Sequence, residues 1–171
     1  MAHFMTRLTS LLIFSAMLCF SSMVVAGEKK EMTYVKTNSR VITKSSTMLA
    51  DTPNHEVKQE TQVSDLKYSD PSFRIKDEVV YLHADEIDGS GPHRGHFIDT
   101  HEDGSHTYGV FDGMTQTVVN ADGSWSATWQ GNYKYVGGSG KYKGIKGSGT
   151  YKGRASSKEP GIEEGKETVE Y

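Results

Sequence analysis

The segment from Trp125 to Tyr135 alternates between two kinds of side chain at every position. Its even positions are all polar, and its odd positions are aromatic or small: Trp125, Ala127, Trp129, Gly131, Tyr133 and Tyr135. Successive side chains of a β-strand point to opposite faces, so the pattern predicts a strand with one aromatic face and one polar face. A sheet with such faces must close on itself or pack against a second sheet.

Asp-Gly pairs divide the second half of the chain into short segments. The pairs lie at positions 88–89, 103–104, 112–113 and 122–123. Asp-Gly tolerates the positive φ that tight hairpin turns require, so each pair between apolar runs predicts a hairpin. The strands expected are residues 56–64, 78–86, 94–101, 106–111, 114–120, 125–136, 146–155 and a closing 165–171. Without any helical periodicity, these segments predict an all-β fold, a small antiparallel β-barrel of about eight strands.

Residues 1–26 have the pattern of a signal peptide. A short basic segment ends at Arg7, an apolar stretch runs from Leu8 to Phe20, and the small residue Ala26 precedes the expected cleavage point. The apolar stretch is shorter than the roughly 20 residues that cross a membrane, so a cleaved signal is favoured over a membrane anchor. We expect the mature protein to begin at Gly27 and to be exported, either to a periplasm or out of the cell.

The remaining chain divides into two parts by composition. Residues 27–54 are polar and rich in Ser and Thr, which predicts a flexible lead-in with one short strand near Tyr34. The barrel domain is expected over residues 55–171. Because Cys19 is the only cysteine, the mature domain has no thiol and must be held together by its core and its strand pairing.

Charge limits the partners that the sequence predicts. The formal net charge is −3, which argues against nucleic-acid binding. Between Ser124 and Ser157 the only charged residues are basic, and they alternate with tyrosines. A surface for polyanions is one interpretation of this run, and lysines that protect strand edges from mispairing are the preferred one.

One glycine-rich stretch resembles a known family. The chain has Q-G-N-Y at 130–133 and G-G-S-G-K-Y-K-G-I-K-G at 137–147. This is similar to the Q-G-x-Y and G-G-[ST]-G-x-[FY]-x-G-x-x-G motifs of the allene oxide cyclase barrel proteins, and the dirigent proteins share a similar corner. The resemblance covers mainly Trp125 to Gly153, and it implies an eight-stranded barrel with a mostly apolar lumen. The cyclases' carboxylate and asparagine, in a Y-E-x-N-E-like run, have no counterpart at residues 56–62, so the resemblance implies the fold and not the activity.

Histidines are concentrated in one region, at positions 83, 93, 96, 101 and 106. Imidazole nitrogen is a common ligand of zinc and copper, but the spacing matches no metal motif. His96 and His101 would face opposite sides of a regular strand. The sequence therefore predicts solvated histidines, with no metal and no cofactor, and a histidine metal site is the alternative.

The preferred functional hypothesis is a soluble exported barrel that binds a small apolar or amphipathic molecule without catalysis. The residues expected to line its lumen are Trp125, Trp129, Tyr133, Tyr135, Tyr151, Tyr81 and Tyr108. One alternative is a cyclase or isomerase that uses the same lumen, with Tyr81, His83 or Tyr108 as acid–base groups. Another is a barrel filled by its own side chains that works through its surface in a cell envelope. No nucleophile motif is present, and the sequence assigns no catalytic residue.

Overall fold

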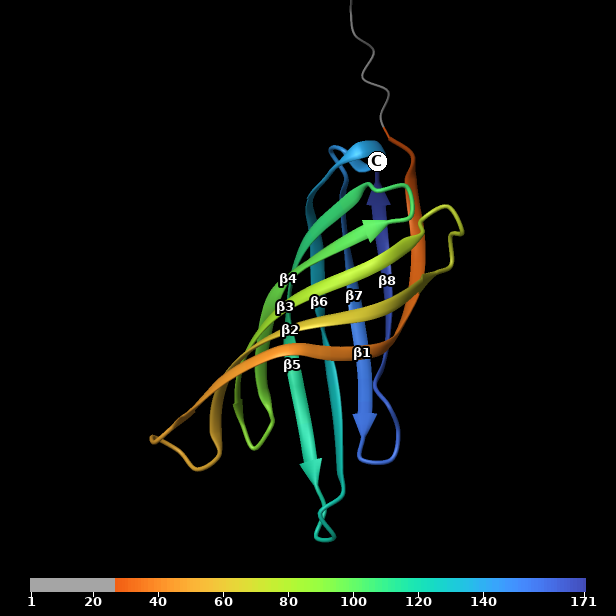
Figure 1. Cartoon of the computed structure of the whole chain (residues 1–171). Coiled ribbons are helices and arrows are strands. Elements are labelled where there is room, and N and C mark those ends of the chain that lie inside the picture. The colour runs from red at the N-terminus through yellow and green to blue at the C-terminus, as the bar shows by residue number, and fades with distance from the viewer. Residues whose placement is uncertain (1–26) are drawn as a thin grey trace, which may run out of the picture.

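The computed structural model describes residues 27–171, and the predicted signal peptide lies outside the described residues. Eight antiparallel strands pair in chain order, and the last pairs with the first to close a barrel (Figure 1). The all-β barrel predicted from the alternation is thus confirmed. The elements are β1 (Lys29–Leu49), β2 (His55–Tyr68), β3 (Ile75–Ile87), β4 (Gly91–His101), β5 (His106–Val119), β6 (Trp125–Gly138), the 3₁₀ helix η1 (Gly140–Tyr142), β7 (Lys146–Ser156) and β8 (Ile162–Glu170).

Three of the four Asp-Gly pairs make hairpin turns. Asp88 and Gly89 both have positive φ, at 52° and 74°, as tight turns between twisted strands require. Gly104 and Gly123 have φ values of 80° and 81° in the two hairpins that follow. The fourth prediction is wrong, because Asp112 and Gly113 lie inside β5 and pair with β4 and β6. The expected strands 106–111 and 114–120 are therefore one strand.

The expectation of a flexible lead-in at residues 27–54 is also wrong. Strand β1 has 21 residues and is the longest in the barrel. Its first part, Lys29 to Lys36, pairs with β8, and from Tyr34 onward it pairs with β2. Residues 34–36 pair with both strands, and a register shift beside Asn38, whose φ is 54°, lies just beyond them. The strand continues into the β1–β2 hairpin, which projects away from the barrel body (Figure 1).

Inward-facing aromatic rings pack over inward-facing glycines on the neighbouring strand. A methyl group built on any of these glycines would overlap the ring opposite. The pairs are Tyr34 with Gly165, Phe97 with Gly109, Phe111 with Gly95, Trp129 with Gly153, Tyr133 with Gly149 and Tyr151 with Gly131. The glycines thus make room for large rings inside a narrow barrel, because glycine permits close approach of neighbouring groups.

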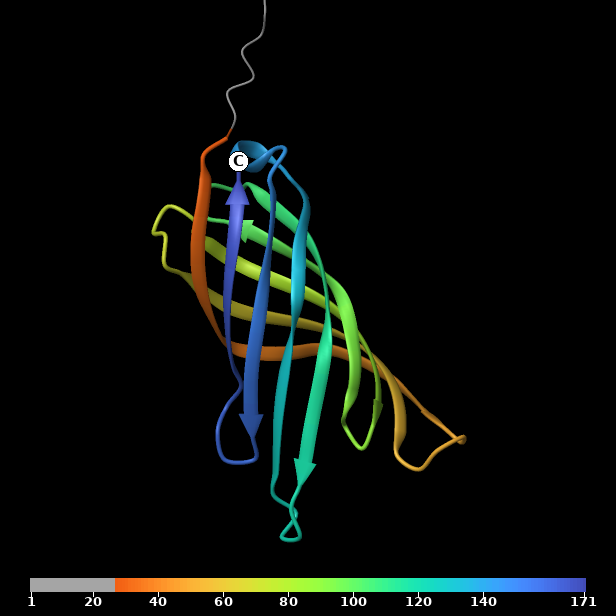
Figure 2. The ribbon, with the colours of Figure 1, turned by 180° about the vertical axis from the view of Figure 1, so that it is seen from behind.

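The two ends of the barrel differ. One end, here called the capped end, carries η1 and the C-terminus (Figure 2). Phe73 of the β2–β3 loop packs there against Tyr142 of η1 and His101, with ring centroids 5.1 and 4.9 Å apart, and all three residues are buried. The β1–β2, β3–β4, β5–β6 and β7–β8 loops spread apart at the other end, here called the hairpin end (Figure 1). The capped end is therefore filled with side chains.

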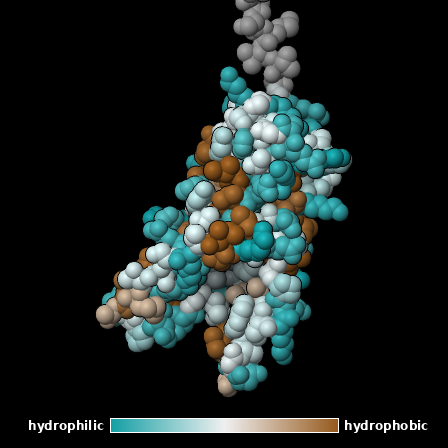
Figure 3. Space-filling model, in the orientation of Figure 1, coloured by the Kyte–Doolittle hydropathy of each residue, from teal (hydrophilic) through white to brown (hydrophobic). Residues whose placement is uncertain are grey.

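The outer face is mainly polar, since the outward positions of most strands carry charged and polar residues. Figure 3 shows one side of this surface as largely hydrophilic, with separate hydrophobic patches along the middle of the barrel. Within residues 27–171, no helix is long and apolar enough to cross a membrane.

Candidate functional site in the barrel lumen

A cavity of about 600 Å³ lies inside the barrel and is lined by residues of all eight strands. Two large hydrophobic residues of its lining are exposed to solvent, Val41 by 51% and Trp125 by 40%. Both lie toward the hairpin end, β1 beyond its register shift and the start of β6. The cavity therefore opens at the hairpin end, and the packed side chains of the capped end lie beyond its inner end.

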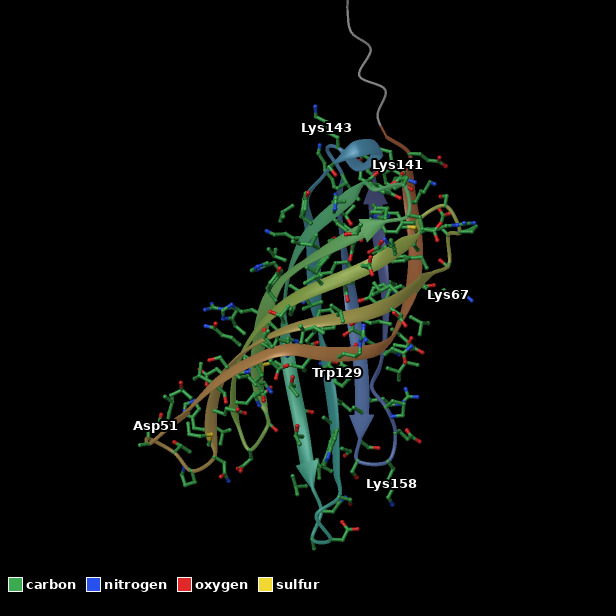
Figure 4. All side chains as sticks on the ribbon, in the orientation of Figure 1. Asp51, Lys67, Trp129, Lys141, Lys143 and Lys158 are labelled. Atoms are coloured by element: carbon green, nitrogen blue, oxygen red, sulfur yellow. The ribbon has the colours of Figure 1, made fainter. Side chains whose placement is uncertain are left out.

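Most of the aromatic residues predicted for the lumen face it. Trp125, Trp129, Tyr133 and Tyr151 line the cavity. Tyr135 points inward as well, and it is buried next to Tyr133 beyond the inner end of the cavity. Figure 4 labels Trp129 in the middle of the barrel, between Lys141 at the capped end and Lys158 at the hairpin end.

Tyr81 and Tyr108 do not line the lumen, and that part of the prediction is corrected. They are 37% and 36% exposed and lie on the outer face. The inward positions of β3 are even, so Tyr81 points outward and stacks on His96 with ring centroids 5.0 Å apart. His83 has the same parity as Tyr81 and is also exposed. None of these three side chains can act as an acid or base inside the cavity.

Glu163 on β8 connects aromatic groups from two other strands. Its Oε2 accepts a hydrogen bond of 2.7 Å from Trp129 Nε1. Its Oε1 accepts one of 3.0 Å from the Tyr34 hydroxyl and lies 3.8 Å from Lys36 Nζ. A carboxylate in the lumen thus fixes the indole and the phenol that form part of the cavity wall.

Lys36 is a buried cation between two carboxylates. Its Nζ lies 2.8 Å from Oε2 of Glu78 and 3.8 Å from Oε1 of Glu163. Burial on its own would lower the pKa of Lys36, but the two carboxylates raise it above its ordinary value. Burial raises the pKa of Glu78, and Lys36 opposes that shift. Lys36 is therefore a charged group and not a free amine nucleophile.

Glu167 lies deeper, next to two tyrosines of β6. The hydroxyl groups of Tyr133 and Tyr135 both donate hydrogen bonds to its Oε2, the latter at 3.0 Å. Burial raises the pKa of Glu167 to about 7, while the two hydrogen bonds act in the opposite direction. Burial also raises the pKa of each tyrosine above its ordinary value.

Asp99 is the most buried carboxyl group that lines the cavity, at 1% exposed. It lies opposite Glu78 in the β3–β4 pairing. Thr107 Oγ1 donates a hydrogen bond of 3.0 Å to its Oδ2. Its Oδ1 has no hydrogen-bond partner among residues 27–171. Burial, and then the neighbouring Glu78, raise the pKa of Asp99 well above its ordinary value.

His93 and Tyr151 form a buried pair across the lumen. His93 Nε2 lies 2.7 Å from the Tyr151 hydroxyl, and Nδ1 lies 2.9 Å from Thr115 Oγ1. Burial lowers the pKa of His93 and raises that of Tyr151, so each neutral form is favoured. Gly113 on β5 faces this pair, and a methyl group there would collide with the Tyr151 hydroxyl and with His93 Nε2. This contact explains why the Asp-Gly pair at 112–113 lies in a strand.

The prediction that the histidines are solvated is wrong for two of them. His93 and His101 are buried, because the inward positions of β4 are odd. The predicted difference in facing is observed, since His96 lies on the outer face against Tyr81. Within residues 27–171, no three His, Cys, Asp or Glu side chains are grouped so that they could hold a metal ion.

The lumen is more polar than the sequence indicated. A second ion pair joins Lys58 to Glu86 at 2.6 Å, nearer the hairpin end. Strand parity accounts for the two inward carboxyl groups of β8. Glu163 and Glu167 share the inward face of this strand with Gly165 and Val169. An acidic strand resembles a solvated tail by composition alone, and the small and apolar residues on the same face were the signal of its burial.

Comparison with protein-family models, with curated proteins and with solved structures finds no match for this chain. The resemblance to the allene oxide cyclase barrel proteins therefore stays a hypothesis.

Proposed function

We propose that this protein binds a small amphipathic molecule in the barrel lumen, without changing it chemically. The observation that carries the proposal is the cavity of about 600 Å³ that opens at the hairpin end. Small-molecule sites are typically concavities of about 300–1,000 Å³ with mainly apolar walls and a few fixed polar groups. The walls here combine aromatic rings with carboxylates and a histidine whose positions are set by hydrogen bonds.

The two kinds of wall suggest how a ligand is held. Trp129 and Tyr151 offer flat apolar surfaces, and their polar atoms already have partners in Glu163 and His93. Because these rings need no partner from the ligand, the apolar part of the ligand can cover them without leaving a polar group unsatisfied. Export of the protein, expected from residues 1–26, is also part of the proposal.

A cavity-filling variant tests the proposal. Ala127 lines the cavity on β6, and the next residue, Thr128, is exposed on the outer face. The neutral fluorophore N-phenyl-1-naphthylamine should bind to the wild type, with a rise in its emission. Ala127→Phe should weaken this binding at least about tenfold, because the ring occupies the space of the ligand. Thr128→Phe is the matched control and should bind like the wild type. Equal binding by all three proteins would contradict a lumenal site.

A second candidate function is an isomerase, favoured by the buried contact between His93 and Tyr151. A neutral imidazole beside a phenol can accept a proton from a bound substrate. To separate binding from isomerisation, the NMR spectrum of ligand extracted from the protein is compared before and after incubation with the protein. An unchanged NMR spectrum supports binding alone. New resonances that disappear in His93→Ala support catalysis.

A further inference from the structure

Carboxyl groups outnumber cations at the inner end of the cavity. Glu78 and Asp99 line the cavity there, Glu163 lines its middle beside Trp129, and Glu167 lies just beyond its inner end. The only lysine among them is Lys36, which already pairs with Glu78 and Glu163. The register joins these groups directly, because Lys36 lies opposite Glu163 and Glu78 lies opposite Asp99. Asp99 and Glu167 therefore have no cation of their own.

Asp99 borders the cavity and has an unused acceptor. The residue is 1% exposed, and its Oδ1 has no hydrogen-bond partner within the described chain. A buried polar atom without a partner is costly and rare in native proteins. Because Asp99 lines the cavity, a donor that enters from the hairpin end can satisfy this oxygen.

Resting on the proposed function, we infer that the ligand is an organic cation: a protonated amine on a small apolar body, whose ammonium group donates to Asp99 Oδ1. The aromatic rings of Phe97 and Tyr133 line the cavity and pack edge to face at 5.9 Å. Such rings attract cations as well as apolar groups. The apolar body lies toward Trp129 and the hairpin end.

Other classes of ligand fit the lumen less well. An anion would meet the excess of carboxyl groups, and both lysines that line the cavity, Lys36 and Lys58, are already paired with glutamates. A metal ion lacks a set of ligands among residues 27–171. A neutral alcohol could donate to Asp99 but would gain nothing from the negative charge.

Binding of an ammonium group should release a proton. Burial favours the protonated form of Asp99 in the empty lumen, because it raises the pKa of this carboxyl group. An adjacent cation favours the carboxylate. The titratable groups that face Asp99 from the surrounding strands are Lys36 of β1, Tyr68 of β2, Glu78 of β3, Tyr133 and Tyr135 of β6, and Glu167 of β8.

Three matched probes test the inference by calorimetry at pH 7: n-octylamine, n-octanol and n-octanoate. We expect octylamine to bind at least about tenfold more tightly than octanol, as a charge-assisted hydrogen bond provides, and octanoate to bind most weakly. Equal or tighter binding of octanol or octanoate would overturn the inference and leave the proposed function intact. If none of the three binds or displaces N-phenyl-1-naphthylamine, and the fluorophore itself does not bind, both proposals fail.

Variants locate the ammonium group. Asp99→Asn should lose the preference for octylamine over octanol, while octanol affinity changes less than about threefold. Asp112→Asn, an exposed carboxylate on the outer face of β5, is the matched control and should keep the preference. Titrations in two buffers of different ionisation enthalpy should show proton release with the wild type and not with Asp99→Asn. If Asp99→Asn does not fold, Glu78→Gln reports on the same site. A full preference for octylamine in the folded variant would contradict the inference.

Discussion

The indole of Trp129 on β6 reaches over β7 and donates a hydrogen bond of 2.7 Å to Glu163 on β8. The residue between them in the β7 register is Gly153, which pairs with Trp129 on one side and with Glu163 on the other. A side chain at position 153 would overlap the indole. One glycine therefore lets two residues of non-adjacent strands meet, and this contact shapes the middle of the cavity.

Replacing Trp129 by Ala should weaken fluorophore binding strongly and destabilise the fold moderately. A tightly packed Trp costs about 3–5 kcal/mol when it is truncated to Ala, and we expect less than about 3 kcal/mol because part of this indole borders open space. Urea unfolding and N-phenyl-1-naphthylamine titration measure the two effects. Gln130→Ala, on the outer face of the same strand, is the control and should change neither. Equal effects at 129 and 130 would contradict the assignment of inner and outer faces.

Replacing Gly153 by Ala tests whether the Trp129 indole crosses β7 over position 153. The added methyl group overlaps the Trp129 ring, and forced overpacking of this kind typically costs about 1–3 kcal/mol. Tryptophan emission should shift as well, because the indole must move away from Glu163. Gly137→Ala is a suitable control, since a methyl group there meets only Tyr108, at 3.8 Å. A Gly153→Ala protein with unchanged stability and emission would show that the indole does not lie over position 153.

Glu167 should make the stability of the protein fall as the pH rises. Its pKa is about 7 in the fold, against an ordinary value of 4.5. Below pH 4.5 it is protonated in the folded and the unfolded chain, and between these values only the unfolded chain ionises. Its contribution is therefore fully present at low pH and is lost as the pH passes 7, by up to about 3 kcal/mol.

The variant Glu167→Gln isolates this effect from all other titrating groups. Its stability relative to the wild type, measured by urea unfolding, should increase between pH 5 and pH 8. Glu164→Gln, on the outer face of β8, should show no such trend. A constant difference between Glu167→Gln and the wild type across this range would mean that Glu167 does not titrate there.

The N-terminus of the mature protein tests the expected export. Protein recovered from the medium or the periplasm should begin at Gly27, as determined by N-terminal sequencing or intact mass. Recovery of chains that begin at Met1 in the membrane fraction would contradict the cleaved signal.

Local patterns predicted the parts of the fold that depend on neighbouring residues. The inner and outer faces of β6 and three of the Asp-Gly turns could be predicted, because side-chain parity and positive φ are properties of a few consecutive positions. Strand β1 could not be predicted in this way. Its inward face begins with the core residues Met32 and Tyr34 but continues with Lys36 and Ser39, which line the cavity, so the apolar pattern stops after two positions.

The site could not be predicted in the same way, because it depends on contacts between residues that are far apart in the sequence. Trp129 and Glu163 are separated by 34 positions, and His93 and Tyr151 by 58. Such pairs are set by the register of the closed barrel. The same register overrides a strong turn signal at Asp112 and Gly113, because the barrel needs a glycine opposite His93 and Tyr151.

The most direct measurement is an isotope-filtered NMR experiment on labelled protein with unlabelled N-phenyl-1-naphthylamine. The methyl groups of Val80 and Ala127 line the cavity, whereas Val118 and Val136 are exposed outside it. We predict intermolecular NOEs from the fluorophore to Val80 and Ala127 and none to Val118 or Val136. NOEs confined to the outer valines would contradict binding in the lumen.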